Sequence, residues 1–145
     1  MASRSDCLSS LIAMRRMVKF IPVILFAAFL LWIITDADGG RYNVFVNFAH
    51  SIPNGDKIGH VFIYGLLTLL ANLALSRHRV SLWTKSIPLG TTIVLIFAII
   101  EEFTQLFFVA RTFDWIDMAC DIVGIGVFTI VSELSYTKAE ECAEK

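Results

Sequence analysis

Four apolar runs, separated by short polar segments, constrain the fold of this chain more than any other feature. Hydrophobic residues make up 57% of the 145 residues, only 17% are charged, and the mean hydropathy is +0.71. A helix that crosses a bilayer needs about 20 predominantly apolar residues. The runs therefore predict an all-α membrane protein, a bundle of four transmembrane helices at about residues 17–35, 57–75, 86–108 and 115–134.

A chain of this length has room for one domain, which we place at residues 17–134. Residues 1–16 are expected to form a cytoplasmic N-terminal segment, and residues 135–145 a mobile cytoplasmic tail. The longest loop, residues 36–55, contains an apolar segment that we expect to lie at the membrane interface. A cleaved signal peptide is the alternative for the first run, because the residues before it are basic. The length of the run favours a retained helix.

The distribution of Lys and Arg predicts the orientation of the bundle. The N-terminal segment and the loop between the second and third helices are rich in them, whereas the opposite side has few and also carries acidic residues. Cytoplasmic loops carry the excess of positive charge, so both termini should be cytoplasmic. The net charge of −1 gives no support to a nucleic-acid partner. The three cysteines form no CxxC pattern, and indicate neither zinc nor a disulfide framework.

With this topology, the second, third and fourth helices carry polar stripes at the same outer face. Charges within a membrane are expensive and are usually kept for a pathway, a pairing or a site. Side chains three or four residues apart share one face of a helix. The stripes are Asp56, His60 and Tyr64 on the second helix, Glu102 and Gln105 on the third, and Asp114, Asp117, Asp121 and Gly124 on the fourth. Three stripes at one level predict a polar site.

Several of these residues also have a purely structural interpretation. The alternatives are helix capping for Asp56 and Asp114, snorkelling for Lys57, and packing with a satisfied polar group for His60 and Tyr64.

Neighbouring positions raise three further points. Glu101 is interpreted as the structural or solvated member of its pair with Glu102, because adjacent helical residues point about 100° apart. Gly124 and Gly126 form a small-x-small pattern typical of a helix contact. Asp121 is the hardest residue to explain structurally, because burying a lone carboxylate costs several kcal/mol, of order 3–5, unless it is paired or protonated. Arg111 is its natural partner, or else receives an anionic ligand.

The order and spacing of these residues resemble a known family. The segments Asp56-Lys57-x-x-His60-x-x-x-Tyr64, Glu102-x-x-Gln105, Arg111 and Asp117-x-x-x-Asp121-x-x-Gly124 are similar to those of the VanZ-like family of small bacterial membrane proteins. The resemblance covers about residues 53–130. It departs at Val109-Ala110, where Pro-Gly is common, and at Asp121, where many members have Asn. It implies a multi-pass protein of the bacterial inner membrane, whose namesake is linked to low-level teicoplanin resistance, and it supplies no molecular activity.

Two functions follow as hypotheses. In the first, the site binds, and in a catalytic version modifies, an anionic envelope lipid or lipid-linked phosphate precursor. Arg111 and Lys57 would hold the phosphate, and His60 with Glu102 or Asp117 would be the acid–base pair. The other ligand-binding candidates are Asp56, Tyr64, Gln105 and Asp121. In the second, the protein is a non-catalytic accessory or assembly factor for cell-envelope or antibiotic-resistance functions.

Two further possibilities are disfavoured by the sequence. A divalent metal site could use His60 with several carboxylates, but no tight ligand motif supports it and we predict no cofactor. An ion or proton pathway is disfavoured because the inner half of the bundle looks apolar.

Overall fold

The computed structural model describes residues 17–41, 43–76, 78–82 and 85–143. Its elements are α2 (Ile21–Asp38), α3 (Val44–Ser51), α4 (Gly55–Leu75), β1 (Arg79–Leu82), β2 (Lys85–Pro88), α5 (Leu89–Thr104), the 3-10 turn η1 (Gln105–Phe107) and α6 (Trp115–Ala143). The predicted N-terminal segment, residues 1–16, lies outside the described residues.

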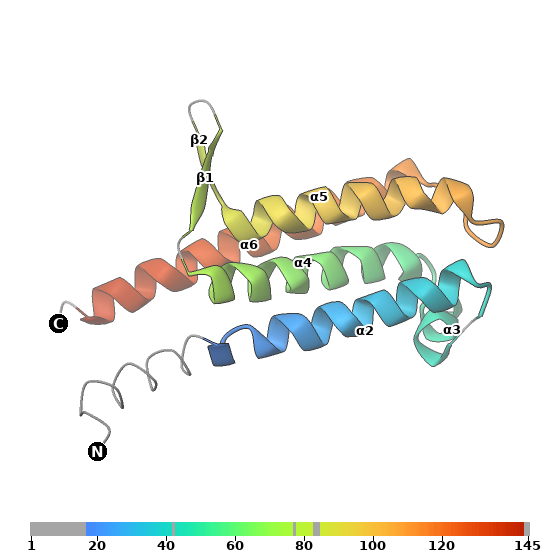
Figure 1. Cartoon of the computed structure of the whole chain (residues 1–145), viewed down its shortest axis with the longest axis horizontal. Helices are drawn as coiled ribbons and strands as arrows, with labels where there is room; N and C mark the ends of the chain where they lie inside the picture. The colour runs from blue at the N-terminus through green and yellow to red at the C-terminus, as the bar shows by residue number, and fades with distance from the viewer. Residues whose placement is uncertain (1–16, 42, 77, 83–84, 144–145) are drawn as a thin grey trace, which may run out of the picture.

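Four helices, α2, α4, α5 and α6, run side by side along the long axis of the molecule (Figure 1). Each is long and apolar enough to cross a membrane: Ile21–Asp38, Gly55–Leu75, Leu89–Phe107 and Trp115–Thr137. The largely helical fold and the four potential transmembrane helices are thus confirmed, and indicate a multi-pass membrane protein. The all-α prediction is amended by the short hairpin of β1 and β2.

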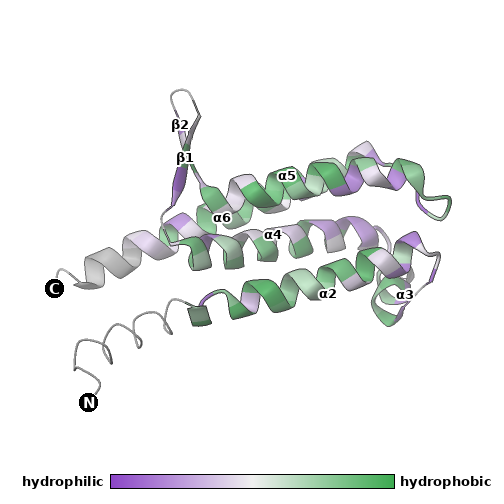
Figure 2. Cartoon of the chain, in the orientation of Figure 1, coloured by the Kyte–Doolittle hydropathy of each residue, from purple (hydrophilic) through white to green (hydrophobic). Residues whose placement is uncertain are grey.

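The bundle has two distinct ends. The hairpin lies level with the start of α2, on the side toward which α6 continues past it, and we call this the hairpin end (Figure 1). At the other end, which we call the α3 end, lie α3, η1 and the first turns of α4 and α6 (Figure 1). The middle of the bundle is coloured mostly hydrophobic, whereas the polar segments gather toward the two ends (Figure 2).

The loop predicted for residues 36–55 contains the short helix α3. The side chain of Asn43 caps it, with Oδ1 accepting hydrogen bonds from the backbone N–H groups of Phe45 and Val46. Asn54 then adopts a left-handed conformation with φ 55°, and α4 begins at Gly55. Asp56 lies inside the first turn of α4 and pairs with Lys57. The predicted capping role of Asp56 is therefore wrong, because the helix begins before it.

The segment between α4 and α5 also differs from the prediction. Residues 79–82 pair with residues 85–88 in an antiparallel hairpin, with Arg79 opposite Pro88. Because these residues are extended, α5 begins only at Leu89, with Pro88 as its N-cap. The regular helix ends at Thr104 and tightens into η1, so the predicted span of 86–108 starts three residues too early, whereas its end agrees within one residue with the span that runs to Phe107.

The last helix extends beyond its predicted end at residue 134. α6 continues without interruption to Ala143, so residues 135–143 belong to the last helix, whereas a tail separate from it was expected. The sequence there is rich in Ala, Glu and Lys, which are strong helix formers, and it contains neither Gly nor Pro. Residues 144–145 lie outside the described residues.

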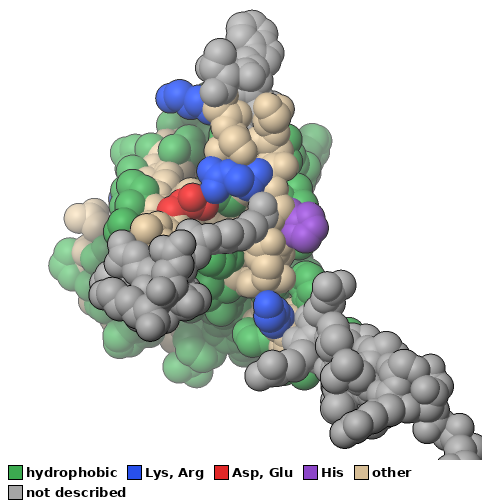
Figure 3. Space-filling model, turned by 90° about the vertical axis from the view of Figure 1, so that its left-hand side faces the viewer, with side chains coloured by type: hydrophobic (Ala, Val, Ile, Leu, Met, Phe, Trp, Pro, Cys, Tyr) green, Lys and Arg blue, Asp and Glu red, His purple; other side chains and the backbone are tan. Residues whose placement is uncertain are grey.

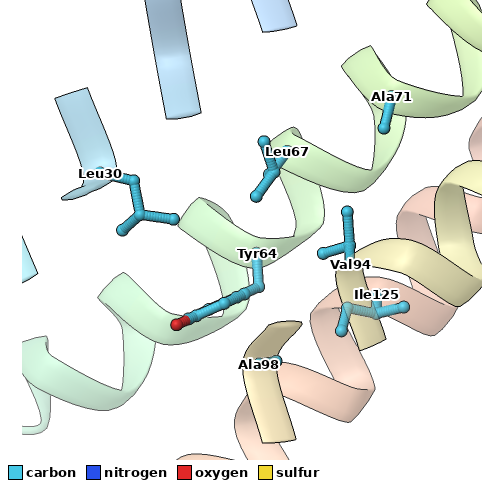
Figure 4. Close-up of a cluster of buried hydrophobic side chains, with 7 residues drawn as sticks. All are labelled: Leu30, Tyr64, Leu67, Ala71, Val94, Ala98 and Ile125. Atoms are coloured by element: carbon cyan, nitrogen blue, oxygen red, sulfur yellow. The ribbon is translucent and has the colours of Figure 1, made fainter. Parts of the chain in front are cut away.

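The apolar core lies between the four long helices. Its buried members are Leu30, Tyr64, Leu67, Ala71, Val94, Ala98 and Ile125 (Figure 4). Large apolar side chains on the outward faces are exposed, for example Leu25 at 65%, Ile96 at 54% and Ile130 at 62%. Exposed apolar surface on this scale is expected where helices face lipid instead of water.

The most extensive helix contact is between α4 and α6. A Cβ atom added to Gly124 would lie 2.2 Å from the carbonyl oxygen of Val61, so only glycine permits this approach. Gly126, in contrast, has no neighbouring atom within 4 Å of such a Cβ. The predicted helix contact is therefore found at Gly124 and not at Gly126.

The hairpin half of the bundle contains buried polar side chains, contrary to the expectation that it is apolar. Asn72 Nδ2 donates to Oγ1 of Thr91 and to Oγ of Ser132, both at 3.0 Å. Asn72 Oδ1 accepts the backbone N–H of Thr91 at 2.9 Å. On α5, the apolar core residues Val94 and Ala98 separate this network from Glu101 at the α3 end. Since its polar groups bind one another, the network joins three helices and has the character of a structural element.

Candidate functional site

Lys57, on the first turn of α4, is surrounded by carboxylates. Its Nζ atom lies 2.9 Å from Oδ1 of Asp117, 3.2 Å from Oδ2 of Asp114 and 3.3 Å from Oδ2 of Asp56. An ammonium group has three N–H donors, so these partners occupy all of them. Lys57 therefore connects α4 to the start of α6 and does not simply snorkel. It has no donor left for a phosphate unless a carboxylate is displaced.

Asp114 has two roles at the start of α6. Its Oδ1 accepts the backbone N–H of Ile116 at 2.8 Å, which confirms the predicted capping, and its Oδ2 binds Lys57. The Ile116 N–H, and then Lys57, hold the pKa of this carboxyl below its ordinary value of 3.8.

The partner of Asp121 is His60, not Arg111. A hydrogen bond of 2.9 Å joins His60 Nδ1 on α4 to Asp121 Oδ1 on α6. Asp121 is 1% exposed, and its second oxygen, Oδ2, has no hydrogen-bond partner. The predicted pairing with Arg111 is wrong because Asp121 lies well inside α6, whereas the Arg111 side chain contacts α5 and η1.

Glu101 belongs to the site and is not solvated. It is 6% exposed, and its Oε2 accepts the hydroxyl of Tyr64 at 3.0 Å. Gln105 Nε2 donates to it at 3.3 Å, and a terminal nitrogen of Arg111 lies 3.5 Å from its Oε1. The sequence interpretation missed this residue, although its i, i+4 relation to Gln105 was a usable signal.

Glu102 is fully buried on the neighbouring face of α5. Its Oε2 accepts Gln105 Nε2 at 2.9 Å, and its Oε1 accepts the backbone N–H of Asp114 at 3.0 Å. Adjacent residues of one helix are both buried because α5 packs against α4 through Glu101 and against the start of α6 through Glu102.

The predicted convergence of the polar stripes is observed, with different partners. His60, Glu102 and Asp121 come from three helices, and one nitrogen or oxygen ligand atom from each lies within 4.8 Å of the others. Asp117 is held at the edge by Lys57, and Arg111 by Glu101. The hydrogen-bond partner of His60 is thus Asp121, where an acid–base pair with Glu102 or Asp117 was expected.

A pocket of about 380 Å³ opens beside this cluster at the α3 end. Side chains of α2 and α3, including Leu30, Ile34 and Phe45, form an apolar wall. The opposite wall is polar and consists of Asp56, His60, Tyr64, Glu101, Gln105, Arg111 and Asp117. Glu102 and Asp121 are not among the lining residues, whereas His60, which is hydrogen-bonded to Asp121, is one of them.

A second pocket, of about 410 Å³, lies at the hairpin end. Its charged lining residues Arg79 and Glu133 bind each other at 2.8 Å. Among the described residues, the buried side-chain atom without a hydrogen-bond partner is Oδ2 of Asp121, in the cluster at the other end, and we therefore place the candidate site at the α3 end.

No family model matches this chain, and no curated protein or solved structure matches it. The resemblance to the VanZ-like family therefore stays a prediction, and the interpretation of the site depends on its geometry.

Proposed function

We propose that the protein is a VanZ-like protein of the bacterial inner membrane that binds an amphipathic ligand with a phosphate headgroup, an anionic envelope lipid or a lipid-linked precursor. The observation that supports this most directly is the pocket at the α3 end, which pairs an apolar wall with a polar wall that includes Arg111. Small-molecule sites are typically apolar clefts with a few well-placed polar groups. The apolar side chains of α2 and α3 would accommodate an acyl or prenyl chain.

Arg111 is the residue best suited to receive the phosphate. It is the only Lys or Arg among the described residues that line this pocket, and its side chain is 21% exposed. Its contacts are long, 3.4 Å to Gln105 Oε1 and 3.5 Å to Glu101 Oε1, at the limit of hydrogen bonding. A phosphate that offers two oxygens to the guanidinium would replace these weak contacts with a bidentate pair.

Binding is the function that we propose, and His60 is the residue that would act as the catalytic acid or base if the ligand is also modified. It lines the pocket and is hydrogen-bonded to Asp121, so it is positioned to exchange a proton with a bound ligand. If ligand binding persists and no product forms, the protein acts as a non-catalytic accessory, the second function raised by the sequence.

The orientation is part of the proposal. Lys and Arg side chains are visible at the hairpin end (Figure 3), and Lys19, Arg79 and Lys85 are exposed there. By the positive-inside rule, the hairpin end and both termini would lie in the cytoplasm. The pocket would face the outer side of the membrane.

The test is lipid binding by purified protein, measured by native mass spectrometry. The ligands are phosphatidylglycerol, a polyprenyl phosphate, phosphatidylcholine and free inorganic phosphate. We expect the two anionic lipids to bind more tightly than phosphatidylcholine, and free phosphate to bind weakly because it leaves the apolar wall empty. Arg111→Gln should weaken anionic-lipid binding by about tenfold or more, since a charge-assisted hydrogen bond contributes about 1.5–3 kcal/mol.

Arg111→Lys should recover only part of this loss, because an ammonium cannot form the bidentate pair. Arg41→Gln is the matched control, since Arg41 is an exposed arginine that pairs with Asp36 outside the pocket. Equal binding of anionic and zwitterionic lipids, or unchanged binding by Arg111→Gln, would contradict the proposal.

A further inference from the structure

We propose that His60, Glu102 and Asp121 form a binding site for one divalent transition-metal ion of the Zn²⁺ or Mn²⁺ type. This inference goes beyond the proposed lipid binding and does not depend on it. The sequence offered no ligand motif because the three residues lie on three different helices, α4, α5 and α6.

The distances between the three side chains suit a shared ion. Metal–ligand bonds to imidazole nitrogen and carboxylate oxygen are about 2.0–2.2 Å, so ligand atoms on one ion lie about 3 Å apart when adjacent and up to about 4.4 Å when opposite. His60 Nδ1 and Asp121 Oδ1 are 2.9 Å apart, and all three ligand atoms lie within 4.8 Å of one another. A contraction of a few tenths of an ångström would complete the site.

The charges of the cluster favour a cation. Glu102 is 0% exposed and Asp121 1%, and in the described part of the chain no Lys or Arg forms an ion pair with either. Asp121 Oδ2 is buried without any hydrogen-bond partner. Two buried carboxylates so close together repel each other unless a positive charge or a proton intervenes. A divalent ion would neutralise both, and if Asp121 bound it through both oxygens, the orphaned Oδ2 would gain a partner.

The surroundings hold the candidate ligands in place. Gln105 Nε2 and the backbone N–H of Asp114 bind the two oxygens of Glu102. The His60 ring stacks on Tyr64 with centroids 6.0 Å apart and an interplanar angle of 19°. Partners that orient metal ligands in this way are a general property of metal sites.

The donor set indicates the kind of metal. Imidazole suits Zn²⁺ and other transition ions, carboxylates suit Mn²⁺ as well, and Mg²⁺ or Ca²⁺ prefer an all-oxygen set. One nitrogen and two carboxylates therefore favour Zn²⁺ or Mn²⁺ over Mg²⁺.

The test uses the full chain, purified in an uncharged detergent without added lipid and treated with a chelator. Zn²⁺, Mn²⁺ or Mg²⁺ is then added alone. Bound Zn²⁺ is counted by mass spectrometry of the dialysed protein, Mn²⁺ binding is followed by electron paramagnetic resonance, and the melting temperature is recorded in parallel. We expect one Zn²⁺ or Mn²⁺ per chain and a higher melting temperature with either ion than with Mg²⁺.

Two groups of variants distinguish ion binding at this site from unspecific ion binding to other carboxylates of the protein. Asp121→Asn and Glu102→Gln keep the side-chain shape, His60→Gln replaces the imidazole by a polar amide, and each should weaken Mn²⁺ binding by about tenfold or more. Asp56→Asn and Asp114→Asn change carboxylates that bind Lys57 instead, and should leave the affinity for Mn²⁺ unchanged. No stoichiometric ion on the wild-type protein, or equal losses in both groups of variants, would overturn the proposal. Because no lipid is added in this experiment, its outcome does not depend on whether the protein binds lipid, and the two proposals can fail separately.

Discussion

Asp121 of α6 lies 2.9 Å from His60 of α4, and the histidine is the only hydrogen-bond partner of this buried carboxylate among the described residues. The pair joins the two helices that pack most extensively against each other. A carboxylate at this depth has no water to replace a lost partner, so its stability depends on the histidine.

Replacing His60 by Ala should therefore destabilise the protein. With a chelator present, we expect the free energy of unfolding to fall by about 1–3 kcal/mol, since a buried acceptor loses its donor. His78→Ala is the control, because His78 is exposed at the hairpin end and should change stability by less than about 0.5 kcal/mol. The measurement is denaturant unfolding in detergent micelles. Equal stability of the two variants would show that Asp121 needs no partner.

Two glycines of α6 offer a second comparison. Gly124→Ala places a Cβ atom 2.2 Å from the Val61 carbonyl oxygen, and the forced separation of α4 and α6 should cost about 1–3 kcal/mol. Gly126→Ala meets no atom within 4 Å and should stabilise the helix by up to about 1 kcal/mol. The same unfolding measurement tests both variants. Effects of the same sign would show that α4 and α6 do not touch at Gly124.

Asp114 should make stability depend on pH. Its pKa is lowered from 3.8 by the Ile116 N–H and by Lys57, so the stabilisation by its charge is present above pH 3.8 and is lost as the pH falls through the lowered value. Asp114→Asn keeps a capping side chain and loses the charge. The wild-type protein should therefore unfold at a higher temperature than Asp114→Asn near neutral pH, and the difference should close in acid. A difference that grows in acid would contradict this assignment.

The orientation of the bundle can be tested by cysteine labelling. On a background that lacks Cys7, Cys120 and Cys142, a membrane-impermeant reagent added to intact cells should label Val44→Cys, at the α3 end. Ser81→Cys, in the hairpin, should react only after the membrane is permeabilised. Both positions are exposed, so access depends on the side of the membrane. The reverse pattern would place the pocket on the cytoplasmic face.

The sequence predicted the helices of this fold better than the side-chain contacts between them. Apolar runs gave the four spans, and helical spacing placed His60 and Asp121 at one level, because both signals are local. The partner of Asp121 could not be read in the same way. The identity of the partner depends on how α6 is rotated and shifted along its axis relative to α4. Close contacts such as that of Gly124 with Val61 determine this arrangement. A sequence pattern can indicate that Gly124 lies at a helix contact, but it does not show which residue of α4 lies opposite.

The interpretations of Glu101 and of the polar tail differ from the structure for different reasons. Interpreting Glu101 as the structural or solvated member of its pair assumed that only one of two adjacent faces of α5 reaches the site, whereas the helix contacts α4 on one side and the start of α6 on the other. The tail was expected to be mobile because it is polar. Its residues nevertheless favour the helix. The polarity of a segment indicates whether it lies in water or in the membrane, but it does not indicate whether the segment is helical.

The length of α6 has a geometric consequence for the protein as a whole. At about 1.5 Å per residue, its 29 residues extend about 43 Å, whereas the hydrocarbon core of a bilayer is about 30 Å thick. If Trp115 lies at one interface, the last turns of α6 project into water on the opposite side. The helix that carries Asp121 at the α3 end therefore continues past the far side of the bilayer as one uninterrupted rod.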